Sequence, residues 1–548
     1  MGTLRISLYD PGMTLLHHVG LAGLWMTLEA LEREYPEQTA AMRNLGGFWQ
    51  RERTAVKLWW DGDGKAFFNR LFTVSFRLTP DGRIWLPGIG HPDQSGDLGV
   101  TLQNALLNTY LQHGRHRCAD SPNQPTGTLT LTIDETQVPV RYRKVAWYQH
   151  QRAANDFALD RPIRVKGWLF PGGAVRHSSY EDATALTEPP ERWLALLYAP
   201  VATFYFSVRR AGLAVRPSFC LVLAELDDLP TLATLRRALV PNPVKELVVS
   251  GGADAALRVL SAIEARHLQE HLRAARCQVI TFGKVGWVQA QQIRIDVFDA
   301  EAVPADARRQ YALLHQALPA ILRPKAVGRQ QNSRRSLRSE NTTSHDAESE
   351  VTERYIVSPV LDLAARNLVN GRSWWMGFAR LLSDQLLRQQ LKTHLGGLYQ
   401  QQRQEGGLAA VVRNASAFTD PGAKAIVEAC HEAWRRRLGQ LSKEAKRGRF
   451  EFGTLVERER ERWRVALASC RNLAALRATL MDFWSRAGAP IPVLQQHWQE
   501  ILPFLTEARW QEARDLALLA LVSYASEERP ETAEADVEAA QAGEEISA

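Results

Sequence analysis

The residue spacing with the clearest chemical meaning is His267-Leu-Gln-Glu270-His271, which sets two imidazoles one helical turn apart beside a carboxylate. Imidazole nitrogens bind Zn²⁺ and a glutamate can act as a general base, so inverted zinc proteases use this H-x-x-E-H spacing. A third ligand is required, and no companion motif supplies one. A zinc-dependent hydrolase is therefore the alternative hypothesis, and an amphipathic helix with two surface histidines is the simpler interpretation.

Other catalytic patterns are incomplete. His345-Asp346 has the order of the metal-binding pair of HD phosphohydrolases, but it stands alone in a polar segment. Ser250-Gly251-Gly252 precedes a predicted helix whose amides could hold a phosphate, yet the Lys and Ser/Thr of a Walker loop are missing. No G-x-S-x-G occurs, and the five cysteines form no C-x-x-C pair. We therefore expect no catalytic residue, no metal site and no cofactor.

Clusters of basic residues point to a polyanion as the partner. Arg141, Arg143 and Lys144 follow a predicted strand, with Trp147 and Tyr148 just after them. A second cluster crowds one helical region, with only Glu444 interrupting seven bases: Arg435, Arg436, Arg437, Lys443, Lys446, Arg447 and Arg449. Cations near aromatic rings suit a groove that follows a nucleic-acid backbone. A solvated helix face is the alternative, and it explains the second cluster poorly.

The net charge of +7 conceals an asymmetry along the 548 residues. Residues 526–548 hold eight acidic side chains and one basic one, whereas residues 1–525 hold 66 basic against 52 acidic, a net charge of +14. A strongly basic body predicts binding that weakens steeply with salt. We expect a cytoplasmic protein with reduced thiols, because we find neither a secretory signal nor an apolar run long enough for a membrane span.

The pattern of helices and strands that would position these residues predicts an α+β protein. Residues 1–322 read as a mixed α/β domain, since short apolar runs alternate with helical patterns and turn residues. The clearest helix covers Leu15–Glu34. The clearest strand-like runs are Ala55–Trp60, Phe72–Leu78, Thr128–Ile133, Gln137–Tyr142, Leu196–Val208 and Ser218–Ala224.

The composition changes after this domain. Residues 323–354 are polar and basic, include Arg334 and Arg335, and predict a flexible linker, because they hold too little apolar area to offset the entropy of ordering. Residues 355–525 have helical period and predict a bundle of four to six helices, with a break expected at Gly406-Gly407. Residues 526–548 predict an acidic, disordered tail.

The N-terminal stretch Leu8-Tyr-Asp-Pro-Gly-Met-Thr-Leu-Leu-His-His-Val-Gly-Leu-Ala-Gly-Leu-Trp25 resembles the start of a known family. The match is to the large subunit of type I CRISPR Cascade complexes, in the MYXAN subtype. It is carried by Pro11-Gly12-Met13-Thr14, His17 and the small-residue motif Gly20-Leu21-Ala22-Gly23-Leu24. These residues look structural: we expect the two glycines to admit close approach of another element, and the two leucines to lie in the core.

This resemblance implies a non-catalytic subunit of an RNA-guided complex. Such a subunit contacts the 5′ handle of the CRISPR RNA, reads the protospacer-adjacent motif (PAM) on double-stranded DNA, and promotes R-loop formation. Its bundle steers the displaced strand. The implied partners are the CRISPR RNA, target double-stranded DNA, the backbone, handle-binding and small subunits, and a helicase-nuclease or transposon-targeting effector. A general DNA-binding scaffold outside CRISPR remains an alternative.

Site residues do not transfer from the family, so the candidates rest on local chemistry. Asn123 and Gln124 present amides that can reach base edges, and Arg141, Arg143 and Lys144 can hold the flanking phosphates. Gly172 and Gly173 form a second loop that would let the backbone approach DNA. Contact with the nucleic-acid backbone is expected from Arg334, Arg335, Arg435, Arg436, Arg437, Lys443, Lys446 and Arg447.

Overall fold

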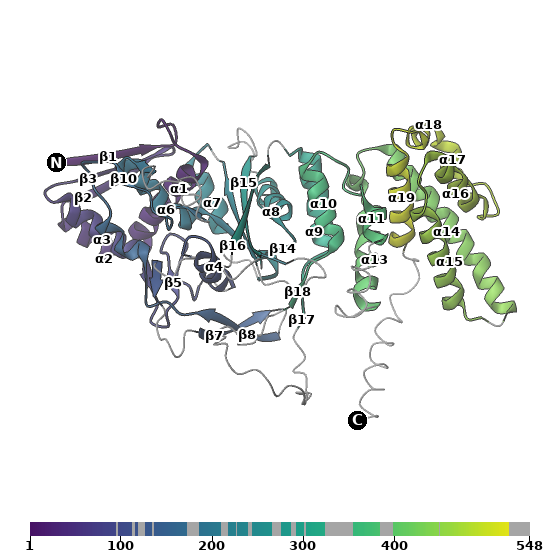
Figure 1. The fold of residues 1–548 in the computed structure, drawn as a ribbon, viewed down its shortest axis with the longest axis horizontal. Helices are drawn as coiled ribbons and strands as arrows, with labels where there is room; N and C mark the ends of the chain where they lie inside the picture. Colours follow the sequence, from purple (N-terminus) through teal and green to yellow (C-terminus); the bar gives the residue numbers. More distant parts are fainter. Residues whose placement is uncertain are drawn as a thin grey trace, which may run out of the picture. The chain divides into compact units, whose positions relative to one another are not determined.

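The computed structural model describes residues 1–94, 97–111, 116–118, 126–133, 136–171, 186–209, 218–225, 227–238, 244–265, 276–285, 292–300, 303–323, 354–383, 398–448 and 450–524 (Figure 1). The chain divides into two compact units, residues 1–308 with 319–371 and residues 309–318 with 372–548. In the described residues the first unit mixes strands and helices and the second is helical. The predicted α+β class is therefore confirmed.

A three-stranded antiparallel sheet opens the first unit. Its order is β1 (Gly2–Ser7), β3 (Ala55–Trp60) and β2 (Gly47–Arg51), and its inner face packs on the helices α1 (Leu15–Glu34) and α6 (Pro190–Ala202). In β1 and β3 the inward-facing side chains are buried, and in β2 the inward-facing Trp49 and Arg51 are half-buried, as a sheet with one covered face requires.

Helices α1 and α6 touch at their backbones. A Cβ atom on Gly20 would lie 1.9 Å from the Ala195 carbonyl oxygen, and one on Gly23 would lie 2.1 Å from that of Tyr198. Only glycine leaves room for this approach. Leu21 and Leu24 are fully buried. The structural role expected for the small-residue motif is thus confirmed.

A five-stranded sheet forms the centre of the first unit. Its order is β14 (Val248–Val249), β12 (Phe204–Val208), β13 (Ser218–Ala224), β15 (Cys277–Val285) and β16 (Gln292–Ala300), and only the β12–β14 pair is parallel. Helix α8 (Gly252–Ala265) packs on this sheet, and α1 and α4 (Asp97–Asn108) also contact its strands. Residues 219–224 of β13 are all buried, so the middle of the sheet is interior, whereas Val297 of the edge strand β16 is exposed.

Three antiparallel pairs of strands carry basic residues of this unit. They are β4 (Arg77–Leu78) with β5 (Ile84–Trp85), β6 (Arg117–Cys118) with β9 (Trp147–Tyr148), and the longer hairpin β7 (Thr126–Ile133) with β8 (Thr136–Arg143). The hairpin lies below α4 and β5 in Figure 1. It contacts α4 through β8.

Two predicted strands are wrong in part. Residues 72–75 of the run Phe72–Leu78 end helix α3 (Gly64–Ser75), and only Phe76 and β4 are extended. The first half of Leu196–Val208 belongs to α6, and β12 begins at Phe204. Residues 196–208 are buried throughout, and in residues 72–76 only Thr73 is exposed, so the apolar residues carry no clear period that separates helix from strand.

The second unit is built around α19 (Trp510–Ser523), which is buried along most of its length. It contacts α11 (Phe378–Ser383), α13 (Leu398–Arg413), α14 (Pro421–Arg447), α15 (Phe452–Ala468) and α16 (Leu473–Ser485). Two short helices, α17 (Pro492–Gln496) and α18 (Trp498–Ile501), precede α19. The described residues of this unit thus hold more helices than the four to six expected.

Two details differ from the expected bundle. Helix α13 continues through Gly406-Gly407, where a break was predicted. Glycine is needed at position 407 because the helix passes close to the Ala317 carbonyl, and a Cβ atom there would lie 2.4 Å from that oxygen. Helix α10 (Pro359–Val369) lies in the first unit and packs on α8. Most of the expected linker, residues 324–353, lies outside the described residues, as does the tail after residue 524.

Candidate nucleic-acid interface

One face of the β7–β8 hairpin is polar and exposed. Antiparallel pairing sets Thr126 opposite Arg143 and Thr128 opposite Arg141, and all four side chains are exposed. Since side chains alternate between the two faces of a strand, the hydroxyl and guanidinium groups line up on the same side. These groups are donors of the kind that bind phosphate oxygens.

The base of the hairpin is held by buried hydrogen bonds. The Tyr142 hydroxyl donates to Oδ2 of Asp81 at 2.9 Å and to its carbonyl oxygen at 3.1 Å. Gln103 of α4, which is 1% exposed, donates from Nε2 to the Arg143 carbonyl at 2.7 Å and accepts from the Ile84 amide at 2.8 Å. The two exposed arginines of β8 therefore extend from a fixed backbone.

Arg117, on β6, adds a third guanidinium that sequence reasoning missed. Burial, together with the charge of nearby Arg143, lowers the pKa of Arg117 to about 10. In the part of the chain that the structure describes, neither arginine has a carboxylate within 4 Å. Two like charges without a counterion attract an anion between them. The basic run at 115–117 was the signal that could have identified this residue.

The other basic and aromatic residues near β8 are not equally exposed for contact with a nucleic acid. Lys144 is half-buried. The Arg152 guanidinium lies 3.8 Å from the ring centroid of Trp147, so one face of this indole is covered. Tyr148 is buried and donates its hydroxyl hydrogen to the Arg77 carbonyl at 3.2 Å. Tyr148 is therefore part of the core and cannot stack on a base.

Several predicted sites lie outside the described residues. They are the loop residues Asn123, Gln124, Gly172 and Gly173, the linker residues Arg334 and Arg335, the histidine–glutamate motif at His267, Glu270 and His271, and the pair His345-Asp346. In the residues that the structure does describe, no three His, Cys, Asp or Glu side chains gather as metal ligands.

The three consecutive arginines of α14 are ion-paired within the second unit. Arg435 and Arg436 both bond to Glu432, and Arg437 bonds to Glu459 at 3.1 Å and to Glu444 at 2.9 Å. Glu459 belongs to α15, so spacing along α14 alone could not reveal it. Only Arg437 links α14 to α15, whereas Arg435 and Arg436 pair within α14, and all three cations already have a carboxylate partner.

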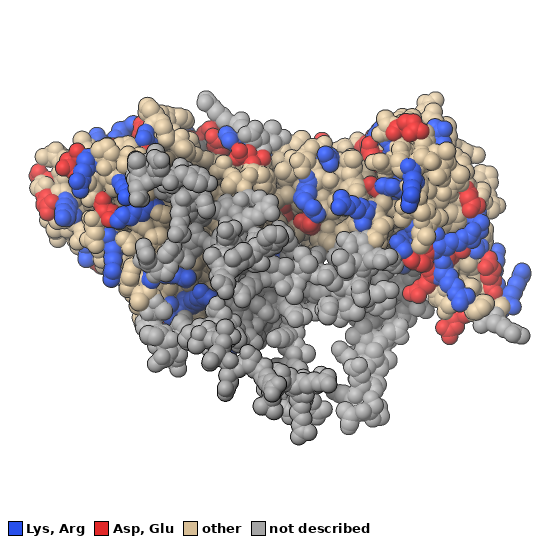
Figure 2. Space-filling view, in the orientation of Figure 1, with Lys and Arg blue, Asp and Glu red and all other residues tan. Residues whose placement is uncertain are grey.

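The end of α14 is different. Lys443, Lys446 and Arg447 are exposed and form no ion pair with the described residues. Beyond them, Phe450 is 52% exposed and Phe452 is 44% exposed. Figure 2 shows basic side chains interspersed with acidic ones at this end of the second unit. We call residues 443–452 the α14–α15 tip, a site that combines cations with exposed aromatic rings.

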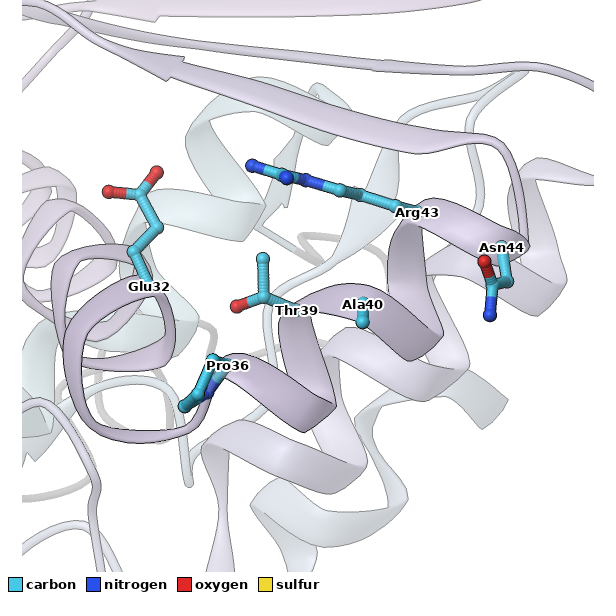
Figure 3. A pocket seen from close by; sticks show the side chains of 6 residues that line it. All are labelled: Glu32, Pro36, Thr39, Ala40, Arg43 and Asn44. Carbon is cyan, nitrogen blue, oxygen red and sulfur yellow. The ribbon is translucent and has the colours of Figure 1, made fainter.

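A shallow pocket of about 280 Å³ lies beside α1 and α2 (Pro36–Asn44) (Figure 3). Its one carboxylate, Glu32, accepts from the Trp49 indole at 2.7 Å and from Arg51 at 2.6 Å. The carboxylate is therefore already paired and is not free to act as a general base. This pocket supports no catalytic assignment.

Comparison with known proteins identifies the family. Residues 5–197 match the DevT N-terminal domain and residues 414–547 match the DevT C-terminal domain. The CRISPR-associated protein Cas8a1/Csx13 of Myxococcus xanthus (strain DK1622) is 28% identical over 95% of this chain and 88% of its own length. This chain therefore matches both DevT domains. The expected resemblance to the MYXAN-type large subunit is confirmed, and the chain is a component of a Cascade complex.

The DevT motif at the N-terminus has a structural explanation. Arg192 of α6 donates to the Pro11 carbonyl at 2.8 Å, and Gly12 has a φ of +82° directly against this guanidinium. Nδ1 of His17 accepts from the Thr14 amide at 3.1 Å, which closes the first turn of α1. Burial, and then the charge of Arg192, lower the pKa of His17 to about 4, so this histidine is neutral.

The DevT matches include both candidate surfaces, one on each unit. The N-terminal match contains Arg117 and the β7–β8 hairpin, and the C-terminal match contains the α14–α15 tip.

Among the helices that the structure describes, none has both the length and the apolar content to span a membrane.

Proposed function

We propose that this chain is a non-catalytic large subunit that recognises the PAM on target double-stranded DNA. In this role it promotes R-loop formation and recruits a downstream effector, either a helicase-nuclease or a transposon-targeting module. Its partners are the CRISPR RNA, the target DNA and the backbone, handle-binding and small subunits. The M. xanthus relative supports the assignment to Cascade, and the basic surfaces support contact with nucleic acid.

The observation that carries the proposal is the exposed face of β7–β8. Arg141 and Arg143 extend from a fixed hairpin beside Arg117, with threonine hydroxyls opposite them. Such a surface holds DNA phosphates without reading sequence. In the sequence the segment that contains Asn123 and Gln124 connects β6 to β7, so we assign base contacts to these two amides.

We assign the displaced strand to the α14–α15 tip. Lys443, Lys446 and Arg447 can bind phosphates, and Phe450 and Phe452 can stack on unpaired bases. The ion pairs of Arg435, Arg436 and Arg437 favour a structural role for these three residues.

Binding of duplex targets by the assembled complex tests the proposal. With Arg141→Ala/Arg143→Ala, affinity should fall to a similar extent on every flanking sequence, and the slope of log K against log salt should fall by about two. With Asn123→Ala/Gln124→Ala, discrimination between flanking sequences should fall instead. Arg161→Ala, an exposed arginine of the same unit, is the control. Unchanged affinity and slope in the double-arginine variant would refute the proposed interface.

A further inference from the structure

The β1–β3–β2 sheet has an outer face that no described residue covers. The inner-face residues of its strands pack on α1 and α6, whereas alternate residues are exposed or half-buried. On the outer face these residues are Thr3, Arg5, Phe48, Gln50, Lys57 and Trp59. All three strands contribute, and they lie near the N-terminus in Figure 1.

Two aromatic rings lie side by side on this face. Phe48 and Trp59 are register partners across β2 and β3, with ring centroids 6.2 Å apart and planes 14° from parallel. Phe48 is 41% exposed. Exposing two adjacent large rings to water costs free energy, so such a patch indicates a binding surface.

Cations and an amide occupy the neighbouring row. Lys57 pairs in register with Arg5 on one side and Gln50 on the other. The Lys57 ammonium lies 5.8 Å from the Trp59 ring centroid. The ion pair of Arg5 with Glu52 is long, at 3.5 Å, and the Arg5 side chain is 52% exposed. Such a pair contributes little free energy, so a phosphate can replace the carboxylate.

We propose that this outer face binds single-stranded RNA, with bases stacked on Phe48 and Trp59 and phosphates held by Lys57 and Arg5. Open antiparallel sheets with exposed aromatic residues stack unpaired RNA bases, and the Gln50 amide can bond to a ribose 2′-hydroxyl. A surface for a protein partner would be expected to have apolar residues beside Phe48 and Trp59, whereas this sheet has the cations Arg5 and Lys57 there. Duplex DNA offers no free base face. The inference rests on the proposed function only in naming the CRISPR RNA as the natural ligand.

Fluorescence anisotropy of the full chain tests this, with a 12-nucleotide RNA, DNA of the same sequence as a single strand, and a duplex. Phe48→Ala/Trp59→Ala should weaken RNA binding by roughly 10- to 100-fold, since each stacked base contributes strongly. Phe48→Tyr should retain it. Trp498→Ala, an aromatic residue 38% exposed in the second unit, is the matched control and should have no effect. Lys57→Glu changes the charge of the same face without removing a ring, and it should also weaken RNA binding.

Each outcome is decisive. RNA affinity that stays unchanged in both Phe48→Ala/Trp59→Ala and Lys57→Glu overturns the inference, as does single-stranded DNA binding as tightly as RNA through these residues. Loss of assembly with the other subunits at full RNA affinity would identify a protein-docking surface instead. The duplex arm separates the two proposals, because the sheet variants should leave duplex binding intact while Arg141→Ala/Arg143→Ala reduces it.

Discussion

Arg117 and Arg143 bring two positive charges together on the first unit, with no described carboxylate to neutralise them. Burial and repulsion both act against the charged form of Arg117, so this arrangement costs stability in the free protein. A phosphate between the two guanidinium groups would reverse that cost. Arg437 differs because it bonds to two glutamates, so we propose a binding role for Arg117 and a structural role for Arg437.

Replacing Arg117 with methionine, which keeps the aliphatic length, should therefore separate binding from stability. We expect duplex affinity to fall and the salt slope to fall by about one, while the thermal unfolding midpoint stays level or rises. Anisotropy and calorimetry measure the two quantities. A protein that is destabilised but binds normally would show that Arg117 is structural.

His17 predicts a response to acid. Its folded pKa of about 4 lies below the unfolded value of 6.5, so the folded state resists protonation. The stabilising contribution is complete above pH 6.5 and disappears as the pH falls to 4, a loss of about 3 kcal/mol. His17→Asn retains an acceptor for the Thr14 amide and should flatten this part of the pH profile in urea unfolding. Equal pH dependence in both proteins would contradict the prediction.

Sequence reasoning proposed Arg141 and Arg143 because they are close in sequence to a predicted strand and to aromatic residues, which is a local pattern. It missed Arg117, which reaches the hairpin only through the non-local pairing of two two-residue strands. It could not foresee the ion pairs of Arg435, Arg436 and Arg437, because one of the acids, Glu459, lies on another helix. Exposure of Phe48 and Trp59 on one sheet face equally depends on which face α1 covers.

At the scale of elements, the α1–α6 contact decides which helix substitutions are tolerated. Gly20→Ala would push a methyl group into the backbone of α6 and should cost about 3 kcal/mol of the free energy of unfolding. Gly439→Ala is the matched control, because nothing lies within 4 Å of that Cβ position in α14. It should stabilise the protein by about 0.5–1 kcal/mol. Equal effects in denaturant titrations would refute the assigned packing.

Gln103 anchors the β7–β8 hairpin, and its loss should act on both stability and binding. Gln103→Ala leaves the Ile84 amide and the Arg143 carbonyl without a partner, at a cost of about 2 kcal/mol. Duplex affinity should fall although no charge has changed. Hydrogen exchange of the β8 amides should rise, and unchanged exchange would show that the hairpin is held elsewhere.

The helix Leu15–Glu34 and the strands Ala55–Trp60 and Ser218–Ala224 were predicted with their bounds, because turn residues and apolar spacing mark their ends. Where turn residues do not mark the end of an element, the prediction was wrong: the ends of α3 and α6 were expected to be strands. Gly407 of α13 shows the opposite case, because glycine often ends a helix but here lies inside one and allows its backbone to approach that of Ala317.

At the scale of the whole molecule, the charge asymmetry should set non-specific affinity. Removing residues 526–548 changes the net charge from +7 to +14. We expect tighter binding to random-sequence duplex DNA and a larger gain at low salt, where screening is weakest. Titrations at two salt concentrations measure both. Equal affinities for the full and shortened chains would show that the acidic segment does not compete with DNA.

The contact between α1 and α6 also affects how the chain is made. About 155 residues separate the end of α1 at Glu34 from the start of α6 at Pro190. At roughly 5–20 residues per second, a ribosome needs on the order of 10–30 s to supply the second helix. Until then the face of α1 that packs on α6 has no partner, although α2, β2 and β3 can already contact other parts of this helix. A nascent chain would therefore depend on chaperones at this stage, and a ribosomal pause before residue 190 would promote aggregation.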